Sequence, residues 1–290
     1  MTGALVTTEW LAGHLNDDRV KIVDASYYIA GGVAKARELY GESHIPGALF
    51  FDIDAFADPT KQKIHAFPPA SAFAEQAGAL GLTNADHIIA YDGMFGTCAA
   101  ARAWFMFRAF GHAKVSVLDG GFSKWVTEGR PVTKEIRSPK HSTFNVHALP
   151  LPVLGQDDVL GNIASGHFQM LDARAAGRFE GSEPEPRAGL RAGHIPGSLN
   201  LPFMELIDSQ THVWKEPPAL KQAFAEAGVD LSHPLATTCG SGVSACALAF
   251  GAYLAGKDDT VIYDGSWVEW GANSSLPVVS GPVTAKPHPS

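Results

Sequence analysis

The chain has few cysteines, few basic residues and no long apolar run, and each shortage excludes a class of protein. Cys98, Cys239 and Cys246 are the only cysteines among 290 residues, too few for a disulfide framework and without the paired spacing of a structural zinc site. Lysine and arginine number 22 against 30 aspartates and glutamates, which gives a formal net charge of −8. A broad basic face for nucleic acid is therefore not expected.

No segment approaches the roughly 18 apolar residues that a membrane span needs, and the N-terminal sequence lacks the basic and apolar regions of a secretory signal. We therefore expect a cytoplasmic protein in a reducing compartment, with no membrane or nucleic-acid partner. The composition, 46% hydrophobic and 18% charged, is typical of a globular protein. The length favours about two domains.

An internal repeat supports the division into two domains. Three blocks occur twice in the same order, with offsets of 145 to 150 residues: 23–25 returns as 171–173, 44–48 as 194–198, and 118–122 as 263–267. A repeat of this period indicates duplicated domains. The proline-containing stretch between the halves predicts a linker at 138–154, so we expect an N-terminal domain at 1–137 and a C-terminal domain at 155–290.

Each half alternates short apolar runs with helical patterns. We expect strands at 21–25, 48–54 and 87–93 with a helix at 100–111 in the first half, and strands at 170–173, 198–203, 234–238 and 260–265 with helices at 219–229 and 244–256 in the second. Such alternation predicts an α/β fold in which each half has a mainly parallel sheet flanked by helices on both faces.

The feature with the clearest chemistry is the loop 239–245, CGSGVSA, between the predicted strand 234–238 and the following helix. Ligands of open parallel sheets bind beyond the carboxyl ends of the strands. Two glycines let the backbone N–H groups converge on one centre, and the helix adds its positive end. We expect Cys239 to be a thiolate nucleophile; the alternative is a small buried packing residue. Packing is the expected role of Cys246 and Cys98.

Several motifs together resemble one family. The block HIPGALFFDID at 44–54, the segment RFEGSEPEPRAGLRAGHIPGSLNLPF at 178–203, the cysteine loop and YDGSWVEWG at 263–271 look like the tandem form of the rhodanese superfamily of sulfurtransferases, over nearly the whole chain. The loop is neutral and is similar to the CGSGVTA loop of the members that use 3-mercaptopyruvate, with Ser244 in place of threonine. Thiosulfate-using members have basic residues after the cysteine.

The resemblance implies that Cys239 takes sulfur from 3-mercaptopyruvate as a persulfide and passes it to cyanide, a small thiol or a thioredoxin-like protein. It implies no metal or organic cofactor. It also implies that only the C-terminal domain is catalytic, because Asp92 or Met94 lies opposite Cys239 in the first half and neither forms a persulfide.

The resemblance also implies the remaining site residues. Arg178 and Arg187 would hold the donor's carboxylate and carbonyl, which suits the planar guanidinium fork; ordinary salt bridges are the alternative. The relay of the family maps onto Ser241, His65 and Asp54, and a histidine has a pKa suited to proton transfer; a solvated loop histidine is the alternative. The expected donor-binding loop residues are Gly240, Gly242, Val243 and Ser244. Trp267 and Trp270 are expected to pack in the core.

Three other functions compete with this interpretation. A thiosulfate sulfurtransferase would use the same nucleophile with another donor. A cysteine-dependent phosphatase would need arginine after five intervening residues, where this chain has Ala245. A tandem module that only binds partners would share the fold, because fold does not establish activity.

Overall fold

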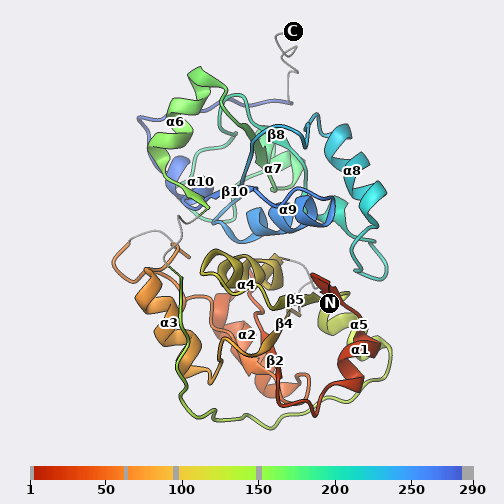
Figure 1. Cartoon of the computed structure of the whole chain (residues 1–290). Helices are drawn as coiled ribbons and strands as arrows, with labels where there is room; N and C mark the ends of the chain where they lie inside the picture. Colours follow the sequence, from red (N-terminus) through yellow and green to blue (C-terminus); the bar gives the residue numbers. More distant parts are fainter. Residues whose placement is uncertain (1–2, 62–64, 94–97, 148–151, 283–290) are drawn as a thin grey trace. The chain divides into compact units, whose positions relative to one another are not determined.

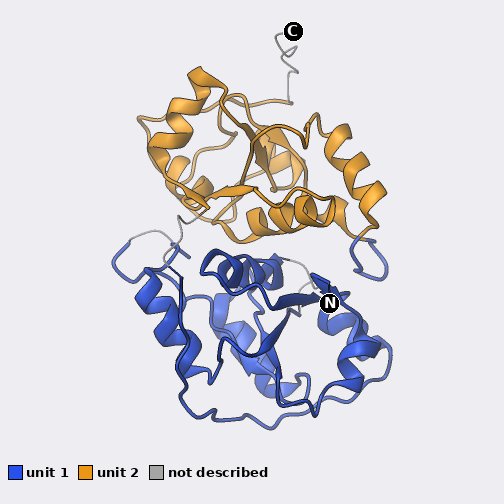
Figure 2. Ribbon diagram, viewed as in Figure 1, with its two compact units in different colours: residues 1–151, 208–214 blue, residues 152–207, 215–290 orange. Residues whose placement is uncertain are grey.

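The computed structural model describes residues 3–61, 65–93, 98–147 and 152–282 of the chain. The chain divides into two compact units (Figure 2): unit 1 comprises residues 1–151 and 208–214, and unit 2 comprises 152–207 and 215–290. The division falls inside the predicted linker 138–154, and the domain boundaries predicted from the sequence stay a prediction. No helix in the described parts of the chain has the length and apolar character needed to cross a membrane.

Unit 1 is built on a parallel five-stranded sheet with the order β1-β5-β4-β2-β3, of which Figure 1 labels β2, β4 and β5. Its strands are β1 (Leu5–Val6), β2 (Val20–Asp24), β3 (Leu49–Phe50), β4 (His87–Tyr91) and β5 (Val115–Leu118). Its helices are α1 (Thr8–Gly13), α2 (Gly32–Glu42), α3 (Ala70–Ala79), α4 (Cys98–Ala109) and α5 (Gly121–Thr127).

Unit 2 repeats this topology with the order β6-β10-β9-β7-β8, again all parallel. Its strands are β6 (Val153–Leu154), β7 (Gln169–Asp172), β8 (Leu199–Asn200), β9 (Leu235–Thr238) and β10 (Val261–Tyr263). Its helices are α6 (Gln156–Ser165), α7 (Ala176–Glu180), the 3₁₀ helix η1 (Phe203–Leu206), α8 (Pro217–Glu226), α9 (Val243–Leu254) and α10 (Ser266–Trp270). The predicted α/β fold with two parallel sheets flanked by helices is confirmed.

Two of the predicted strands are much shorter than expected. β3 pairs with β2 through only two residues, and β8 pairs with β7 through only two, whereas the runs 48–54 and 198–203 were predicted as strands. After these pairs the chain leaves the sheet, and its apolar side chains, such as Phe51 and Leu201, are buried without strand pairing. Apolar runs do not distinguish a strand from a buried loop.

The helices α4 and α9 are apolar on nearly all sides. Every residue of α4 except Arg108 is buried, and α9 is buried over most of its length, which is the pattern of a core helix. Cys98 and Cys246 lie in these helices and are 4% and 0% exposed, as expected of packing residues. Trp267 and Trp270 are 1% and 0% exposed within the core of unit 2, so their predicted packing role is confirmed.

The matching histidines His44 and His194 pack as structural elements of their units. His44 Nδ1 lies 2.7 Å from the carbonyl of Tyr40, and His194 Nδ1 lies 2.9 Å from that of Phe179. Each ring also stacks on the aromatic ring of that residue, at 4.0 and 3.7 Å between centroids. Burial lowers the pKa of His194, which keeps its ring neutral, as a hydrogen-bonded turn residue requires.

Candidate active site

The loop that carries Cys239 joins a buried strand to a buried helix. β9 ends at Thr238 and α9 begins at Val243, which is the strand, loop and helix order predicted from the sequence. Gly242, with a φ of 84°, takes a left-handed conformation at the start of α9 that glycine adopts at no steric cost. Its N–H donates to the Cys239 sulfur at 3.1 Å. The sulfur therefore lies at the positive end of a 12-residue helix, where a thiolate is stabilised.

Ser266 supports the backbone of Cys239. It is fully buried and has a φ of 48°, which non-glycine residues rarely adopt. Its hydroxyl accepts the Cys239 N–H at 3.3 Å and donates to the Tyr263 carbonyl at 2.9 Å. We did not predict Ser266 from the sequence, although the repeat places it opposite Gly121, whose φ is 55°. Backbone strain of this kind often accompanies functional sites.

Both predicted arginines reach the residue next to the nucleophile. A Cβ atom added at Gly240 would lie 3.1 Å from Arg178 Nη2 and 3.8 Å from Arg187 Nη1. Arg178 belongs to α7, and Arg187 follows that helix in the same unit. Unit 2 therefore brings together the thiol, the glycine and two guanidinium groups, and the missing side chain at Gly240 leaves them room.

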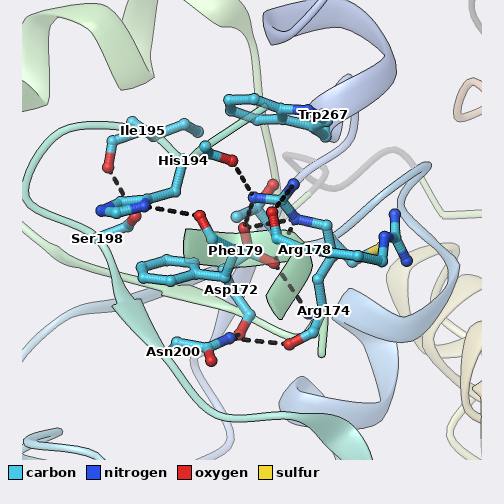
Figure 3. Close-up of polar contacts among 12 residues, drawn as sticks. Asp172, Arg174, Arg178, Phe179, His194, Ile195, Ser198, Asn200 and Trp267 are labelled. Carbon is cyan, nitrogen blue, oxygen red and sulfur yellow. Dashed lines mark hydrogen bonds and ion pairs between the residues drawn. The ribbon is translucent and has the colours of Figure 1, made fainter. Parts of the chain in front are cut away.

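A third arginine, which the sequence analysis did not identify, lies behind these two. The Arg174 side chain is 0% exposed and forms ion pairs with Asp172 at 2.7 Å and Glu185 at 2.7 Å. Its guanidinium lies 4.4 Å from the centroid of the Trp267 ring (Figure 3). Burial alone lowers the pKa of Arg174, but the charges and hydrogen bonds of Asp172 and Glu185 raise it above its ordinary value, so the side chain stays ionised.

Glu185 connects Arg174 to Arg178. Its Oε1 accepts from Arg174 Nη1 at 2.7 Å and its Oε2 accepts from Arg178 Nη2 at 2.6 Å. The Glu185 side chain is 4% exposed, against 18% for Arg178. The signal in the sequence was the second glutamate of the segment 183–187, EPEPR, but only the three-dimensional contacts show which of the two glutamates is buried.

The three residues of the predicted relay lie in different units. Asp54 Oδ1 and His65 Nδ1 are 3.0 Å apart in unit 1. His65 is 2% exposed and has a φ of 57°, which does not fit the alternative of a solvated loop histidine. Arg102 Nη2 donates to the His65 carbonyl at 2.7 Å. Ser241 is buried in unit 2, two residues after Cys239, and its pairing with His65 stays a prediction.

The other predicted loop residues differ in their exposure. Val243 is buried, whereas Ser244 is half-buried at the second position of α9. Among the described residues, no cluster of three or more His, Cys, Asp or Glu side chains is arranged to hold a metal ion.

The fold and the site define a class: two duplicated α/β units, one of which carries a thiol at a helix N-terminus beside two arginines. The rhodanese-like domain model matches residues 7–128 and 155–273. The human 3-mercaptopyruvate sulfurtransferase is 46% identical over 92% of this chain and 91% of its own length. The rat thiosulfate sulfurtransferase is 44% identical over 92% and 91%.

A solved structure agrees with these relatives. SseA from Escherichia coli, described among 3-mercaptopyruvate sulfotransferases, superposes with a TM-score of 0.81 at 35% sequence identity and covers 92% of this chain and 99% of its own. The chain belongs to the rhodanese family. The prediction of a tandem-domain sulfurtransferase, a transferase of sulfur-containing groups, is thereby confirmed.

Proposed function

We propose that this protein takes sulfur from 3-mercaptopyruvate, holds it as a persulfide on Cys239 and passes it to a thiol or to cyanide, releasing pyruvate. The observation that carries the proposal is a sulfur at the N-terminus of α9 with two arginines at Gly240, in a loop whose residues 240–245 include no lysine or arginine. Relatives named for this activity, 46% identical to the chain, support it.

The arginines supply the recognition of the donor. 3-Mercaptopyruvate is an anion with a carboxylate and an adjacent keto oxygen, and a planar guanidinium binds such a pair of oxygens through two N–H groups. Arg178 and Arg187 lie on the side of Gly240, so they would hold these oxygens while the donor's sulfur meets Cys239. The arginine on the keto oxygen would also stabilise the enolate oxygen that develops as the carbon–sulfur bond breaks.

The first step forms the persulfide. The Cys239 thiolate attacks the donor's sulfur, a sulfur–sulfur bond forms, and the carbon–sulfur bond breaks with its electron pair going to carbon 3. The product is the enolate of pyruvate, and the proton that the donor's thiol gives up is delivered to that carbon. The outer sulfur stays on Cys239 as an anion, and the N–H of Gly242 already lies 3.1 Å from the inner sulfur. The N–H groups of Gly240, Val243 and Ser244 would add to this stabilisation.

The second step returns the enzyme to its starting state. Cyanide or a thiolate attacks the outer sulfur, and the sulfur–sulfur bond breaks with its electron pair returning to Cys239. The product is thiocyanate or a persulfide of the acceptor. A small thiol or a thioredoxin-like dithiol is the proposed physiological acceptor, and the scheme needs no metal or organic cofactor.

A relay of Ser241, His65 and Asp54 would move the proton of the first step. The pairing of Asp54 with His65 at 3.0 Å supports it, because a carboxylate that holds one ring nitrogen sets the tautomer of the other. On this proposal only the C-terminal domain, 155–290, carries a cysteine that forms the persulfide, and the N-terminal domain lends it the side chains of His65 and Asp54. We place the protein in the cytoplasm, because its three cysteines, none of them in a disulfide, suit a reducing compartment.

Thiosulfate is the second candidate donor, because relatives named thiosulfate sulfurtransferase are 44% identical to the chain. Thiosulfate is a dianion, and its second charge would rest on the same two arginines and the backbone dipoles. We expect it to react much more slowly than 3-mercaptopyruvate.

The test compares pyruvate release from 3-mercaptopyruvate with thiocyanate formation from thiosulfate, both with cyanide as acceptor. Mass spectrometry after addition of donor alone should show one extra sulfur on the Cys239 peptide. Cys239→Ser should abolish pyruvate release, thiocyanate formation and the addition of sulfur to this peptide. Cys98→Ala, which changes a packing cysteine, should retain all three. If thiosulfate reacts faster than 3-mercaptopyruvate, the donor proposed here is wrong and thiosulfate takes its place. If neither donor reacts, a tandem module that only binds partners becomes the favoured function.

A further inference from the structure

The carboxylate of Glu185 is shared between two arginines with different surroundings. One oxygen binds Arg174 at 2.7 Å and the other binds Arg178 at 2.6 Å. The Glu185 side chain is only 4% exposed. Its ion pairs are therefore buried, unlike exposed ion pairs, which contribute little to stability. Both oxygens are used, and both bonds are charge-assisted.

Arg174 makes one end of this bridge immobile. Besides Glu185, its guanidinium donates to Asp172 through Nε and Nη2 and to the Gly193 carbonyl at 2.9 Å. Its side chain has no exposed surface, and the Trp267 ring covers it (Figure 3). A fully paired, buried network of this kind is rigid, so the position of Glu185 is fixed from the interior of unit 2.

Among the described residues, the Arg178 side chain forms its only hydrogen bond and ion pair with Glu185. The nitrogen that binds Glu185, Nη2, is also the atom that would lie 3.1 Å from a Cβ at Gly240. Its Nε is buried and has no hydrogen-bond partner among the described residues. Glu185 therefore decides where this guanidinium lies relative to the loop of Cys239.

The carboxylate of Glu185 brings a negative charge to the two arginines that it binds, Arg174 and Arg178. It therefore lowers the net positive charge beside Cys239 while it fixes the position of Arg178. Its benefit to the binding of an anion must come through geometry.

We propose that Glu185 is a positioning residue, which holds Arg178 against Gly240 in the place where that arginine binds the carboxylate of the donor. The proposal rests on the proposed function in one respect, the role of Arg178 in donor binding. Its chemical basis is length: a glutamate carboxylate spans both guanidinium groups, whereas aspartate, one carbon shorter, reaches only one of them.

The decisive variant is Glu185→Asp, which keeps the charge and shortens the reach. The readout is alkylation of Cys239 by iodoacetate, an anion, relative to neutral iodoacetamide. Both probes react by forming a sulfur–carbon bond and releasing iodide, and only the first needs a cation nearby. We expect the ratio of the two rates to fall by about threefold or more, towards the value of Arg178→Ala. Glu183→Asp, the same change at an exposed position of the same segment, should leave it unchanged.

Steady-state kinetics distinguish a role of Glu185 in positioning Arg178 from a role in maintaining the structure of unit 2. In Glu185→Asp the KM for 3-mercaptopyruvate should rise about tenfold with kcat changed by less than about threefold, because one charge-assisted contact is lost. In the Arg178→Ala background the same change should have little further effect. The proposal would be overturned if Glu185→Asp had the alkylation ratio and the KM of the wild type. It would also be overturned if Glu185→Asp had an equally large effect in the Arg178→Ala background.

The two readouts distinguish this inference from the proposed function. If the alkylation ratio falls but the wild type does not use 3-mercaptopyruvate, Glu185 positions Arg178 and the donor is another anion. If the wild type uses that donor and neither readout responds to Glu185→Asp, the function stands and the positioning role is wrong. Should Glu185→Asp fail to fold, Glu185→Gln has the same length and loses one of the two bonds; its ratio should also fall, and an unchanged or higher ratio would contradict the proposal.

Discussion

The loop after β4 in unit 1 and the loop after β9 in unit 2 occupy the same place in the two copies of the fold. Asp92 follows β4 as Cys239 follows β9. The Phe122 N–H donates to the Asp92 carbonyl at 3.1 Å, and the Trp267 N–H donates to the Cys239 carbonyl at 2.9 Å. By these backbone contacts Asp92 is the counterpart of Cys239. Met94, the other candidate from the sequence, lies outside the described residues.

Both side chains place an acceptor at the N-terminus of a buried helix. Asp92 Oδ2 accepts the N–H groups of Ala99 and Ala100 in α4, each at 2.9 Å, and the Cys239 sulfur accepts the Gly242 N–H at 3.1 Å. A helix N-terminus attracts negative charge whatever its source. In unit 1 the acceptor is a carboxylate that caps α4, whereas in unit 2 it is a thiol, the proposed nucleophile.

The comparison teaches that one scaffold places a capping carboxylate or a thiol, the proposed nucleophile, at the same helix N-terminus according to one side chain and its neighbours. Unit 2 has Arg174 two residues after Asp172, and unit 1 has Ser26 two residues after Asp24. The Ser26 hydroxyl binds the Asp24 carboxylate at 2.5 Å. Unit 1 thus lacks the buried arginine on which the arginine cluster of unit 2 depends.

The largest effect is expected when the two loops are made alike. Cys239→Asp would place the side chain of unit 1 in the loop of unit 2. Activity should fall by at least about 10⁴-fold because the proposed nucleophile is gone. The free energy of unfolding should stay within about 1 kcal/mol of wild type because the carboxylate meets the same helix N-terminus. Urea denaturation and sulfur-transfer assays measure the two quantities.

The control for this variant is Cys239→Ala, which removes the acceptor altogether. If Cys239→Asp unfolds far more easily than Cys239→Ala, unit 2 does not accommodate a carboxylate, and the equivalence of the two loops is limited to their backbones.

The sequence predicts the parts of this site that lie close together in the chain. The loop 239–245 is recognised because its chemistry, its glycines and its position between strand and helix are all local. Arg178 and Arg187 followed from the resemblance to a family, not from any periodicity. β6, at 153–154, was assigned to the linker because a two-residue strand leaves no repeating pattern.

The residues that sequence analysis did not find act through long-range contacts. Ser266 meets Cys239 across 27 positions of sequence, and Glu185 meets Arg174 across 11. Single polar residues give no periodic signal, and salt bridges between distant positions depend on how the elements pack. The burial that gives these contacts their strength is a property of the folded chain alone.

A smaller effect is expected when the cap of unit 1 is removed. Asp92→Ala should destabilise α4 by about 2 kcal/mol, because two N–H groups at its start lose their acceptor and a negative charge leaves the helix N-terminus. Amide hydrogen exchange should show faster opening of α4 and unchanged protection of α9. Asp92→Asn, which keeps an acceptor, should cost less. Equal protection of α4 in wild type and Asp92→Ala would show that Asp92 is not a cap.

The smallest effect is expected at Asp24 in unit 1. Ser26 follows this residue at the position where Arg174 follows Asp172 in unit 2. Burial raises the pKa of Asp24, although the hydrogen bonds from Ser26 act in the opposite direction. As pH rises through the ordinary pKa of aspartate, about 3.9, the Asp24 carboxyl ionises in the unfolded chain before it ionises in the folded one. The free energy of unfolding therefore falls with rising pH until the raised pKa of the folded state is passed. Asp24→Asn lacks this ionisable group, so its stability relative to wild type should increase between these two pKa values. Urea denaturation at a series of pH values measures this difference. Asp18→Asn, the same exchange at an exposed position, is the control. A stability difference for Asp24→Asn that is flat or falls with pH would mean that the Asp24 carboxyl is ionised at least as easily in the folded chain as in the unfolded one.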